Sequence, residues 1–408
     1  MNTTITLLIV GITYIGIAVG RWPIIKSNRA SIVLVGTGLL LATGQIQFEQ
    51  MKELLDLDTL VLLFSMMVLN VNLRMAGFFS AAGSSILRWT RSPRLFLGLE
   101  ILIIGILSAL FLNDTICLMM TPLMIEITTT LKRNPIPYLI ALATASNIGS
   151  TATVTGNPQN MIIGVASGIS YIQFAGALIP PALLGLFVIW IVLVLFYPKE
   201  FQKESFELVP SVPVEISKPM LQKCLIVVAG LLVAFLLGVP VALASLLAAC
   251  VLLITRRTQP QTVFAELDWS LLVFFGGMFI VSGALEVNGI SQYLFDRMNL
   301  SDTLDVVNLT VVTVILSNLV SNVPAVLLLK PVIPQLSNPE AGWLALAAAS
   351  TLAGNLTLLG SVANLIVAES AARWRIELGF IEYTRAGVII TLFSLILGTG
   401  YIALFIWH

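Results

Sequence analysis

The segment SNIGSTATVTGNPQNMI, residues 146–162, places glycine, proline, asparagine and glutamine within a run that is otherwise apolar enough to span a membrane. Glycine permits backbone angles that other residues avoid, and proline removes a backbone N–H donor, so both interrupt helices. In hydrocarbon an unpaired backbone group costs several kcal/mol, so interrupted chain survives there only when it is packed in protein or lines a wet cavity. The segment therefore predicts a broken transmembrane helix with a binding site at its break.

The composition of the whole chain is typical of a membrane protein. Of its 408 residues, 58% are hydrophobic and only 10% are charged, and the mean hydropathy is +0.99. Several apolar runs approach the roughly 20 residues that a bilayer helix needs. We therefore expect an all-α polytopic protein of the inner or plasma membrane, embedded in the lipid bilayer, with spans at residues 3–20, 31–46, 58–73, 137–167, 173–197, 221–238, 241–254, 268–285, 341–371 and 380–407.

The same composition excludes other classes of protein. The formal net charge is zero, which provides no basic surface for nucleic acid, so we expect no nucleic-acid partner. The only histidine is His408, which argues against a histidine-based metal site or catalytic triad. The sequence contains no phosphate loop or nucleophile elbow. We therefore expect neither an ATP-driven pump nor an enzyme, and no cofactor other than sodium acting as a coupling ion.

Two further apolar stretches, residues 95–131 and 306–336, are interrupted in the middle by polar residues. Lysine and arginine favour cytoplasmic loops, so the charges flanking each stretch indicate its side of the membrane. The first stretch is basic at both ends and is predicted to be a hairpin that enters and leaves by the cytoplasmic face, whereas the acidic flanks of the second predict entry from outside. The residues concerned are Arg88, Arg91, Arg94, Lys132 and Arg133 for the first stretch, Asp302, Asp305 and Glu340 for the second, and Arg21, Lys26 and Arg29 for a cytoplasmic first loop.

The two halves of the chain resemble each other. LSALFLNDTICLMMTP (107–122) aligns with LSNLVSNVPAVLLLKP (316–331), SNIGSTATVTGNPQNMI (146–162) with STLAGNLTLLGSVANLI (350–366), and LLFSMMVLNVNLRMAGF (62–78) with FFGGMFIVSGALEVNGI (274–290). These alignments pair Asn113 with Asn322, Gly156 with Gly360, Asn160 with Asn364 and Gly77 with Gly289. Three matches in the same order indicate an internal duplication.

This duplication predicts two inverted-topology repeats, because each half crosses the membrane an odd number of times. Each repeat is expected to hold about five transmembrane helices plus one re-entrant hairpin and one broken helix. The first repeat covers residues 1–197, with its hairpin at 95–131 and its broken helix at 137–167. Residues 198–220 form a cytoplasmic linker, and the second repeat covers 221–408, with its hairpin at 306–336 and its broken helix at 341–371.

The hairpin tips and the helix breaks are expected to meet near the membrane midplane. Freed carbonyls there can bind a cation, and helix N-termini can hold an anion. We therefore predict an ion and substrate site built from Asn113, Asp114, Thr115, Asn147, Thr155, Gly156, Asn157, Asn160, Ser321, Asn322, Thr357, Gly360, Ser361 and Asn364.

Ionisable residues within apolar segments are further candidates, because a charge at membrane depth costs about 3 kcal/mol or more. Asp114 is the strongest, since it can bind a cation or carry a proton. Lys330 either compensates that charge, attracts an anion, or extends to the outer membrane face. Glu126 and Glu369 either contribute to the site, pair with neighbouring helices, or lie near the inner surface.

The segments FLNDTICLMMTPLM (111–124), SNIGSTATVTGNPQNMIIG (146–164), SNVPAVLLLKP (321–331) and GNLTLLGSVANLIVAESA (354–371) resemble the ion transporter superfamily. That superfamily contains the arsenite permeases, the NhaD-type sodium-proton antiporters, the citrate-metal permeases and the divalent-anion/sodium symporters. The resemblance covers nearly the whole chain. It implies a scaffold domain, a mobile transport domain, a homodimer and elevator-like alternating access.

The resemblance also implies roles for the hairpin tips. In the divalent-anion symporters each tip carries Ser-Asn-Thr, which holds sodium and carboxylate, and residues 113–115 and 321–323 occupy the matching positions here. Asp114 and Val323 depart from that pattern, and the Asn-Asp pair of the first tip is closer to the arsenite permeases and antiporters. The implied sodium sites lie at Asn113, Asp114 and Gly156, and at Asn322 and Gly360.

The sequence thus predicts a secondary active transporter of a small anion, either an inorganic oxyanion such as arsenite or a di- or tricarboxylate, coupled to sodium or proton movement. The alternative is a sodium-proton antiporter in which Asp114 exchanges the two cations and no anion binds. An ion channel would need a continuous water path, which the predicted inverted repeat with opposed hairpins disfavours.

Overall fold

The computed structural model describes residues 3–19, 28–89, 92–202, 216–254, 259–290 and 306–406, and these form helices without any strand. Several residues used above lie outside these ranges, so the structure says nothing of them: Arg21, Lys26, Arg91, Asp302, Asp305, His408 and residues 203–215 of the predicted linker. Arg88 lies in a described helix, but its side chain is not described.

The described helices follow a similar order in the two halves of the chain. The first half forms α1 (Thr3–Val19), α2 (Arg29–Ala42), α3 (Phe48–Leu54), α4 (Leu57–Met75), α5 (Phe78–Trp89), α6 (Pro93–Leu110), α7 (Asn113–Thr130), α8 (Pro135–Ser150), α9 (Pro158–Ser167), α10 (Tyr171–Phe196) and α11 (Pro198–Phe201). The second half forms α12 (Lys218–Leu236), α13 (Val241–Leu253), α14 (Pro260–Ala265), α15 (Trp269–Val287), α18 (Val306–Val320), α19 (Asn322–Leu329), the 3₁₀ turn η1 (Ile333–Gln335), α20 (Pro339–Ala353), α21 (Val362–Arg373) and α22 (Phe380–Phe405).

The surface of the molecule suits a bilayer. Six described helices are long and apolar enough to cross a membrane, namely α4, α6, α10, α12, α15 and α22. Leu195 and Leu404, near the C-terminal ends of α10 and α22, are each 70% exposed, and Ile226 of α12 is 72% exposed. Apolar side chains exposed in this number would make a water-soluble protein aggregate, whereas hydrocarbon solvates them.

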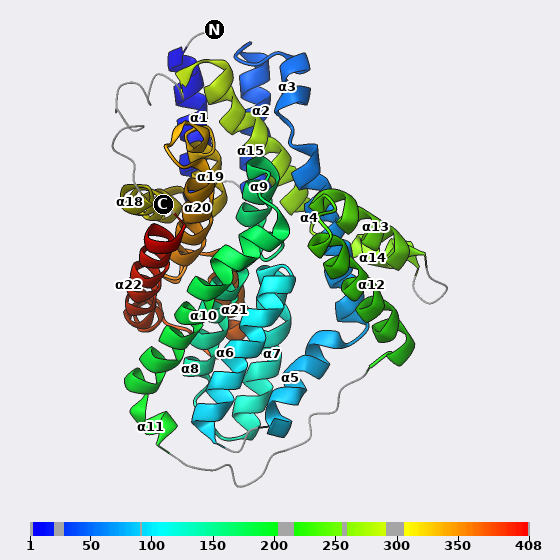
Figure 1. Ribbon diagram of the computed structural model, residues 1–408, viewed down its shortest axis with the longest axis vertical. Coiled ribbons are helices and arrows are strands. Elements are labelled where there is room, and N and C mark those ends of the chain that lie inside the picture. Colours follow the sequence, from blue (N-terminus) through cyan, green and yellow to red (C-terminus); the bar gives the residue numbers. More distant parts are fainter. Residues whose placement is uncertain are drawn as a thin grey trace.

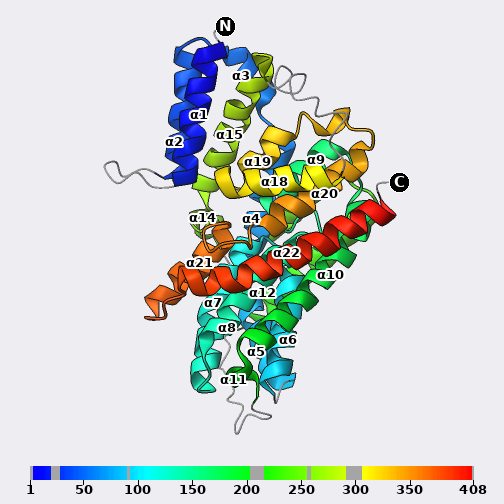
Figure 2. The same ribbon diagram turned by 90° about the vertical axis from the view of Figure 1, so that its left-hand side faces the viewer.

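The two halves pack into each other. Helix α4 of the first half packs against α13 of the second, and α15 of the second packs against α2 of the first. The helices α10 and α22, both of 26 residues, lie side by side, as Figure 2 shows. In Figure 1, α1, α2 and α15 form one group at the top, while α6, α7, α8 and α10 gather lower in the view. The two halves therefore share one continuous hydrophobic core.

The interrupted segments take the form of helix pairs. Helices α6 and α7 are joined by Phe111 and Leu112 alone, and α18 and α19 by Ser321 alone. Ser321 has φ +79° and ψ 160°, a backbone conformation that only glycine adopts without strain. Helix α8 ends at Ser150 and α9 begins at Pro158, while α20 ends at Ala353 and α21 begins at Val362. The chain is thus non-helical at both predicted breaks.

Candidate substrate and ion site

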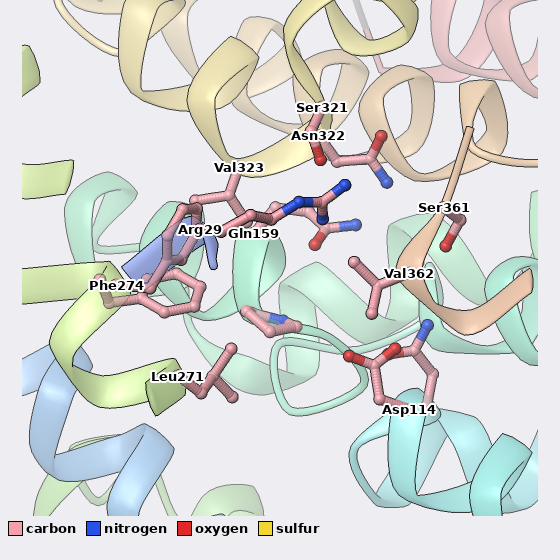
Figure 3. A pocket seen from close by; sticks show the side chains of 13 residues that line it. Arg29, Asp114, Gln159, Leu271, Phe274, Ser321, Asn322, Val323, Ser361 and Val362 are labelled. Carbon is pink, nitrogen blue, oxygen red and sulfur yellow. The ribbon is translucent and has the colours of Figure 1, made fainter. Parts of the chain in front are cut away.

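Helix N-termini meet around one pocket. The first residues of α7, α9, α19 and α21, which are Asn113, Pro158, Asn322 and Val362, all line it. Unpaired N–H groups at a helix N-terminus carry partial positive charge and attract anions. The pocket is small, with a cavity volume of about 70 Å³. Its other lining residues are Arg29, Asp114, Gln159, Leu271, Phe274, Phe275, Ser321, Val323 and Ser361 (Figure 3).

The pocket contains one positive and one negative side chain. Of the described residues that line it, Arg29 and Asp114 are the ionisable ones. Their opposite charges attract each other across the pocket, but no ion pair or hydrogen bond joins them. Figure 3 shows Asp114 at the N-terminal end of α7, with the Arg29 side chain on the other side of the pocket beside Gln159. A solute or ion entering the pocket therefore lies between two unpaired charges.

Three buried amide oxygens in this region lack a hydrogen-bond partner. They are Asn113 Oδ1 at the first hairpin tip, Asn322 Oδ1 at the second tip, and Asn160 Oδ1 in α9. Buried polar atoms are almost always satisfied, so an unpaired oxygen calls for a missing hydrogen-bond donor or cation. Asn113 and Asn322 also occupy equivalent positions in the aligned halves. The two tips therefore present the same kind of unpaired acceptor.

Asn147 of α8 joins both halves of the site. Its Oδ1 accepts hydrogen bonds from Asn113 Nδ2 at 3.1 Å and from Ser361 Oγ at 3.0 Å. Its Nδ2 donates to Asn355 Oδ1 at 2.8 Å and to Asn364 Oδ1 at 3.0 Å. The first hairpin tip and the second helix break are thus held to a single buried amide.

The residue aligned with Asn147 in the second half makes the reciprocal contacts. This residue is Thr351, whose Oγ1 accepts from Asn157 Nδ2 at 3.3 Å and from Gln159 Nε2 at 3.1 Å, both at the first break. Helix α8 of the first half therefore contacts the break of the second half through Asn147, and α20 of the second half contacts the break of the first through Thr351. This crossed arrangement couples the two breaks mechanically.

In each break an asparagine side chain also donates hydrogen bonds to backbone carbonyls of the same break. Asn160 Nδ2 donates to the carbonyl oxygens of Ser150, Thr151 and Thr153 at 3.1, 3.2 and 2.9 Å. Asn364 Nδ2 donates to those of Gly354 and Thr357 at 2.8 and 3.1 Å. Backbone acceptors that the interrupted helices leave free are thereby satisfied. The paired Asn160 and Asn364 of the sequence alignment have the same structural role.

Gly156, in the break between α8 and α9, lies close to the helix pair α6–α7. Its carbonyl oxygen accepts from the Asn113 backbone N–H at 3.0 Å. A Cβ atom at position 156 would lie 2.7 Å from Ser150 Cα and 2.8 Å from the Ser108 carbonyl oxygen. Both neighbours are backbone atoms, which cannot swing aside as a side chain can. Glycine is therefore required here by contact with the backbone.

We expect Gly156→Ala to lower stability by about 1–3 kcal/mol, the usual cost of overpacking, and to abolish transport. Gly176→Ala is the matched control, because nothing lies within 4 Å of a Cβ at that position in α10, and alanine there is expected to be neutral or slightly stabilising. Thermal unfolding of the two purified variants in detergent measures the difference. Equal midpoints for both would show that the close approach at Gly156 is unimportant.

The predicted site residues occupy different positions relative to the pocket. Asn113, Asp114, Ser321, Asn322 and Ser361 line it. The others lie behind the lining or in the breaks: Thr115, Asn147, Thr155, Gly156, Asn157, Asn160, Thr357, Gly360 and Asn364. Of these, Thr115 accepts from Asn70 Nδ2 at 3.4 Å, and Thr155 donates to the Ala109 carbonyl at 3.5 Å.

The further charged candidates do not line the pocket. Lys330 is partly buried directly after α19, and Glu126 of α7 and Glu369 of α21 are exposed. A different acidic residue is fully buried: Glu100 of α6 is 0% exposed, and neither of its carboxylate oxygens has a hydrogen-bond partner. Sequence reasoning did not single out Glu100, although it is also an acidic residue within an apolar stretch.

Other lining residues were absent from the sequence-based prediction. Gln159 lies in the broken segment 146–162 but is not among the predicted site residues, and the sequence indicates Arg29 only as a loop charge. Leu271, Phe274 and Phe275 come from α15, which the sequence presents as an ordinary span. No local signal distinguishes these residues, because their place in the pocket depends on how α2 and α15 pack.

Known transporters match this chain over most of its length. The CitMHS family model, described as a citrate transporter, matches residues 14–353. The silicon efflux transporter LSI3 of Oryza sativa subsp. japonica is 30% identical over 420 residues, covering 86% of this chain and 87% of its own. The putative transporter arsB of Dictyostelium discoideum is 26% identical over 499 residues, covering 92% and 87%.

Two solved transporter structures share this all-helical fold. The YdaH transporter of Alcanivorax borkumensis matches with a TM-score of 0.63 at 16% identity, covering 99% of this chain and 97% of that one. MtrF of Neisseria gonorrhoeae, described as one of a class of antimetabolite efflux pumps, matches with a TM-score of 0.61 at 14% identity, covering 98% and 94%. At sequence identities this low, the two structural matches show a shared fold and nothing further. The family and sequence matches confirm the predicted resemblance to the ion transporter superfamily: this chain is a multi-pass membrane protein, not an enzyme, and belongs to the CitMHS family of secondary transporters.

Proposed function

We propose that the protein moves a small anion, either an inorganic oxyanion such as arsenite or a di- or tricarboxylate, coupled to sodium or proton movement. The observation that carries this proposal is the pocket itself, where the N-termini of α7, α9, α19 and α21 meet beside Asp114. The helix ends favour an anion and the carboxylate favours a cation, so the same space suits both. The names of relatives point to different solutes, citrate in the family description and silicon in LSI3.

We assign the coupling cation to the first hairpin tip, at Asn113, Asp114 and Gly156. Support comes from the unpaired Asn113 Oδ1 next to the unpaired Asp114 carboxylate. A sodium ion takes oxygen ligands, and a proton would instead bind the carboxylate itself. The second tip, at Asn322 and Gly360, is a weaker cation site, because Val323 stands where the first tip has Asp114.

We further propose that the halves are inverted repeats, that α6–α7 and α18–α19 are re-entrant hairpins, and that transport follows an elevator-like mechanism. The similar helix order of the two halves and the reciprocal contacts of Asn147 and Thr351 support the repeats. Hydrogen bonds connect the hairpins and the breaks, so these elements would move together. They would move past the group formed by α1, α2 and α15. Domain bounds at 197 and 221 remain predictions.

Reconstitution into proteoliposomes tests the proposal. Labelled arsenite, silicic acid and citrate are offered separately, with an imposed inward sodium gradient, an imposed pH gradient, or neither. We expect one solute to accumulate above equilibrium when one of the two gradients is present. Solute entry that ignores both gradients would contradict coupling. Sodium-driven proton movement without any solute would support the antiporter alternative, and conductance far above transporter turnover would support a channel.

A further inference from the structure

Arg29 holds a fixed position at the edge of the pocket. It is the first residue of α2, and the preceding Asn28 caps the helix by accepting from the Ser31 backbone N–H at 2.9 Å. Ser31 Oγ in turn accepts from the Asn28 backbone N–H at 3.0 Å. This reciprocal capping box defines where α2 starts and hence where the Arg29 side chain emerges. From there the guanidinium extends into the pocket (Figure 3).

The two charges of the pocket belong to different groups of helices. Helix α2, which carries Arg29, packs mainly against α1 and α15. Helix α7, which carries Asp114, packs mainly against α5, α6, α8 and α21. Figure 3 shows the guanidinium on the side of Gln159 and Asn322, while the carboxylate lies at the first hairpin tip. The pocket is therefore polarised, with its negative side at the first tip and its positive side towards the second.

Few other side chains are available to meet a negative charge. Ser361 Oγ already donates to Asn147 Oδ1, and Gln159 Nε2 already donates to Thr351 Oγ1. Lys330 is not among the residues that line the pocket. The neutral donors left are the helix N-termini, the hydroxyl of Ser321 and the side-chain amides of Gln159 and Asn322, and among the described lining residues Arg29 is the one cation. Val323 also leaves the second tip without a carboxylate that would compete for the guanidinium.

We propose that Arg29 is the residue that recognises the negative charge of the transported solute, at the opposite side of the pocket from the cation bound by Asp114. This inference rests on the proposed function, since it assumes that an anion and a cation share the pocket. A guanidinium presents several N–H donors in a planar fork that matches the two oxygens of a carboxylate or the oxygens of an oxyanion. Arg29 thereby favours ionised solutes over undissociated ones.

Binding measurements on purified protein in detergent test this role. Citrate, which is ionised at neutral pH, and orthosilicic acid, which is undissociated there, are the two solute probes. Arg29→Gln is expected to weaken citrate binding about 10- to 100-fold, as loss of charge-assisted hydrogen bonds does, with a much smaller effect on orthosilicic acid. Arg29→Lys should restore part of the citrate affinity, because it keeps the charge without the planar fork. Arg74→Gln is the matched control, since Arg74 pairs with Glu266 at 2.5 Å and does not line the pocket.

A second measurement distinguishes loss of solute recognition from misfolding. It records cation binding as the sodium- or pH-dependent shift of the thermal unfolding midpoint. We expect Arg29→Gln to keep the shift of the wild-type protein. Unchanged citrate affinity in Arg29→Gln would overturn the inference. Equal losses of affinity for citrate and orthosilicic acid, together with loss of the cation-dependent shift, would also overturn it, because they would indicate a structural role for Arg29. If wild-type protein shows a cation shift but binds neither solute, the proposed anion transport itself fails, and Arg29 loses its assignment with it.

Discussion

Asp114→Asn is expected to abolish gradient-driven accumulation of solute, with a loss of about two orders of magnitude in coupled uptake, while the protein remains folded. Asparagine has nearly the shape of aspartate, so the first hairpin tip keeps its packing. The substitution removes the one carboxylate among the described residues of the pocket, and neither sodium nor a proton then finds a charged partner there. A lost charge-assisted interaction of about 1.5–3 kcal/mol accounts for an effect of this size.

Glu126→Gln is the matched control for this experiment. Glu126 lies on the same helix, α7, but its side chain is exposed and does not line the pocket. Uptake into proteoliposomes under a sodium or pH gradient should be near wild type for this variant. If Asp114→Asn accumulates solute as well as Glu126→Gln does, the coupling cation binds elsewhere, and the fully buried Glu100 becomes the next acidic residue to replace.

Asn147→Ala is expected to cause the largest loss of stability. The substitution removes the common partner of Asn113, Ser361, Asn355 and Asn364. Each hydrogen bond contributes about 1 kcal/mol net, and each buried group left unpaired costs about 1–3 kcal/mol. A total loss of several kcal/mol follows, together with loss of transport, because the amide connects a hairpin tip of one half to the break of the other.

Asn72→Ala provides the comparison. Asn72 is also buried, but its Nδ2 donates within its own helix, to the Val68 carbonyl at 2.8 Å. Ser361→Ala, which removes one of the Asn147 contacts, should fall between the two. Thermal unfolding midpoints in detergent are expected in the order Asn72→Ala, Ser361→Ala, Asn147→Ala, from highest to lowest. A midpoint for Asn147→Ala equal to that of Asn72→Ala would show that the link between the halves is dispensable.

Most helices could be anticipated because apolar runs and their interruptions are local properties of the chain. The predicted broken helix at 137–167 corresponds to α8 and α9, and that at 341–371 to α20 and α21. Boundaries were less accurate where a single residue ends a helix: the span expected at 31–46 ends at Ala42, because Gly44 takes a left-handed conformation with φ +67°. The homodimer is a prediction that a single chain does not test.

By itself the amino-acid sequence determined the class of protein, the places where helices break, and the candidate status of Asp114, since each depends on residues that are neighbours along the chain. Only the tertiary structure decided that Arg29 shares the pocket with Asp114, that α15 supplies aromatic walls, and that Asn147 binds residues more than 200 positions away. These facts depend on distances between segments that are far apart in sequence. Composition shows that a polar group must be satisfied in hydrocarbon, but packing selects its partner.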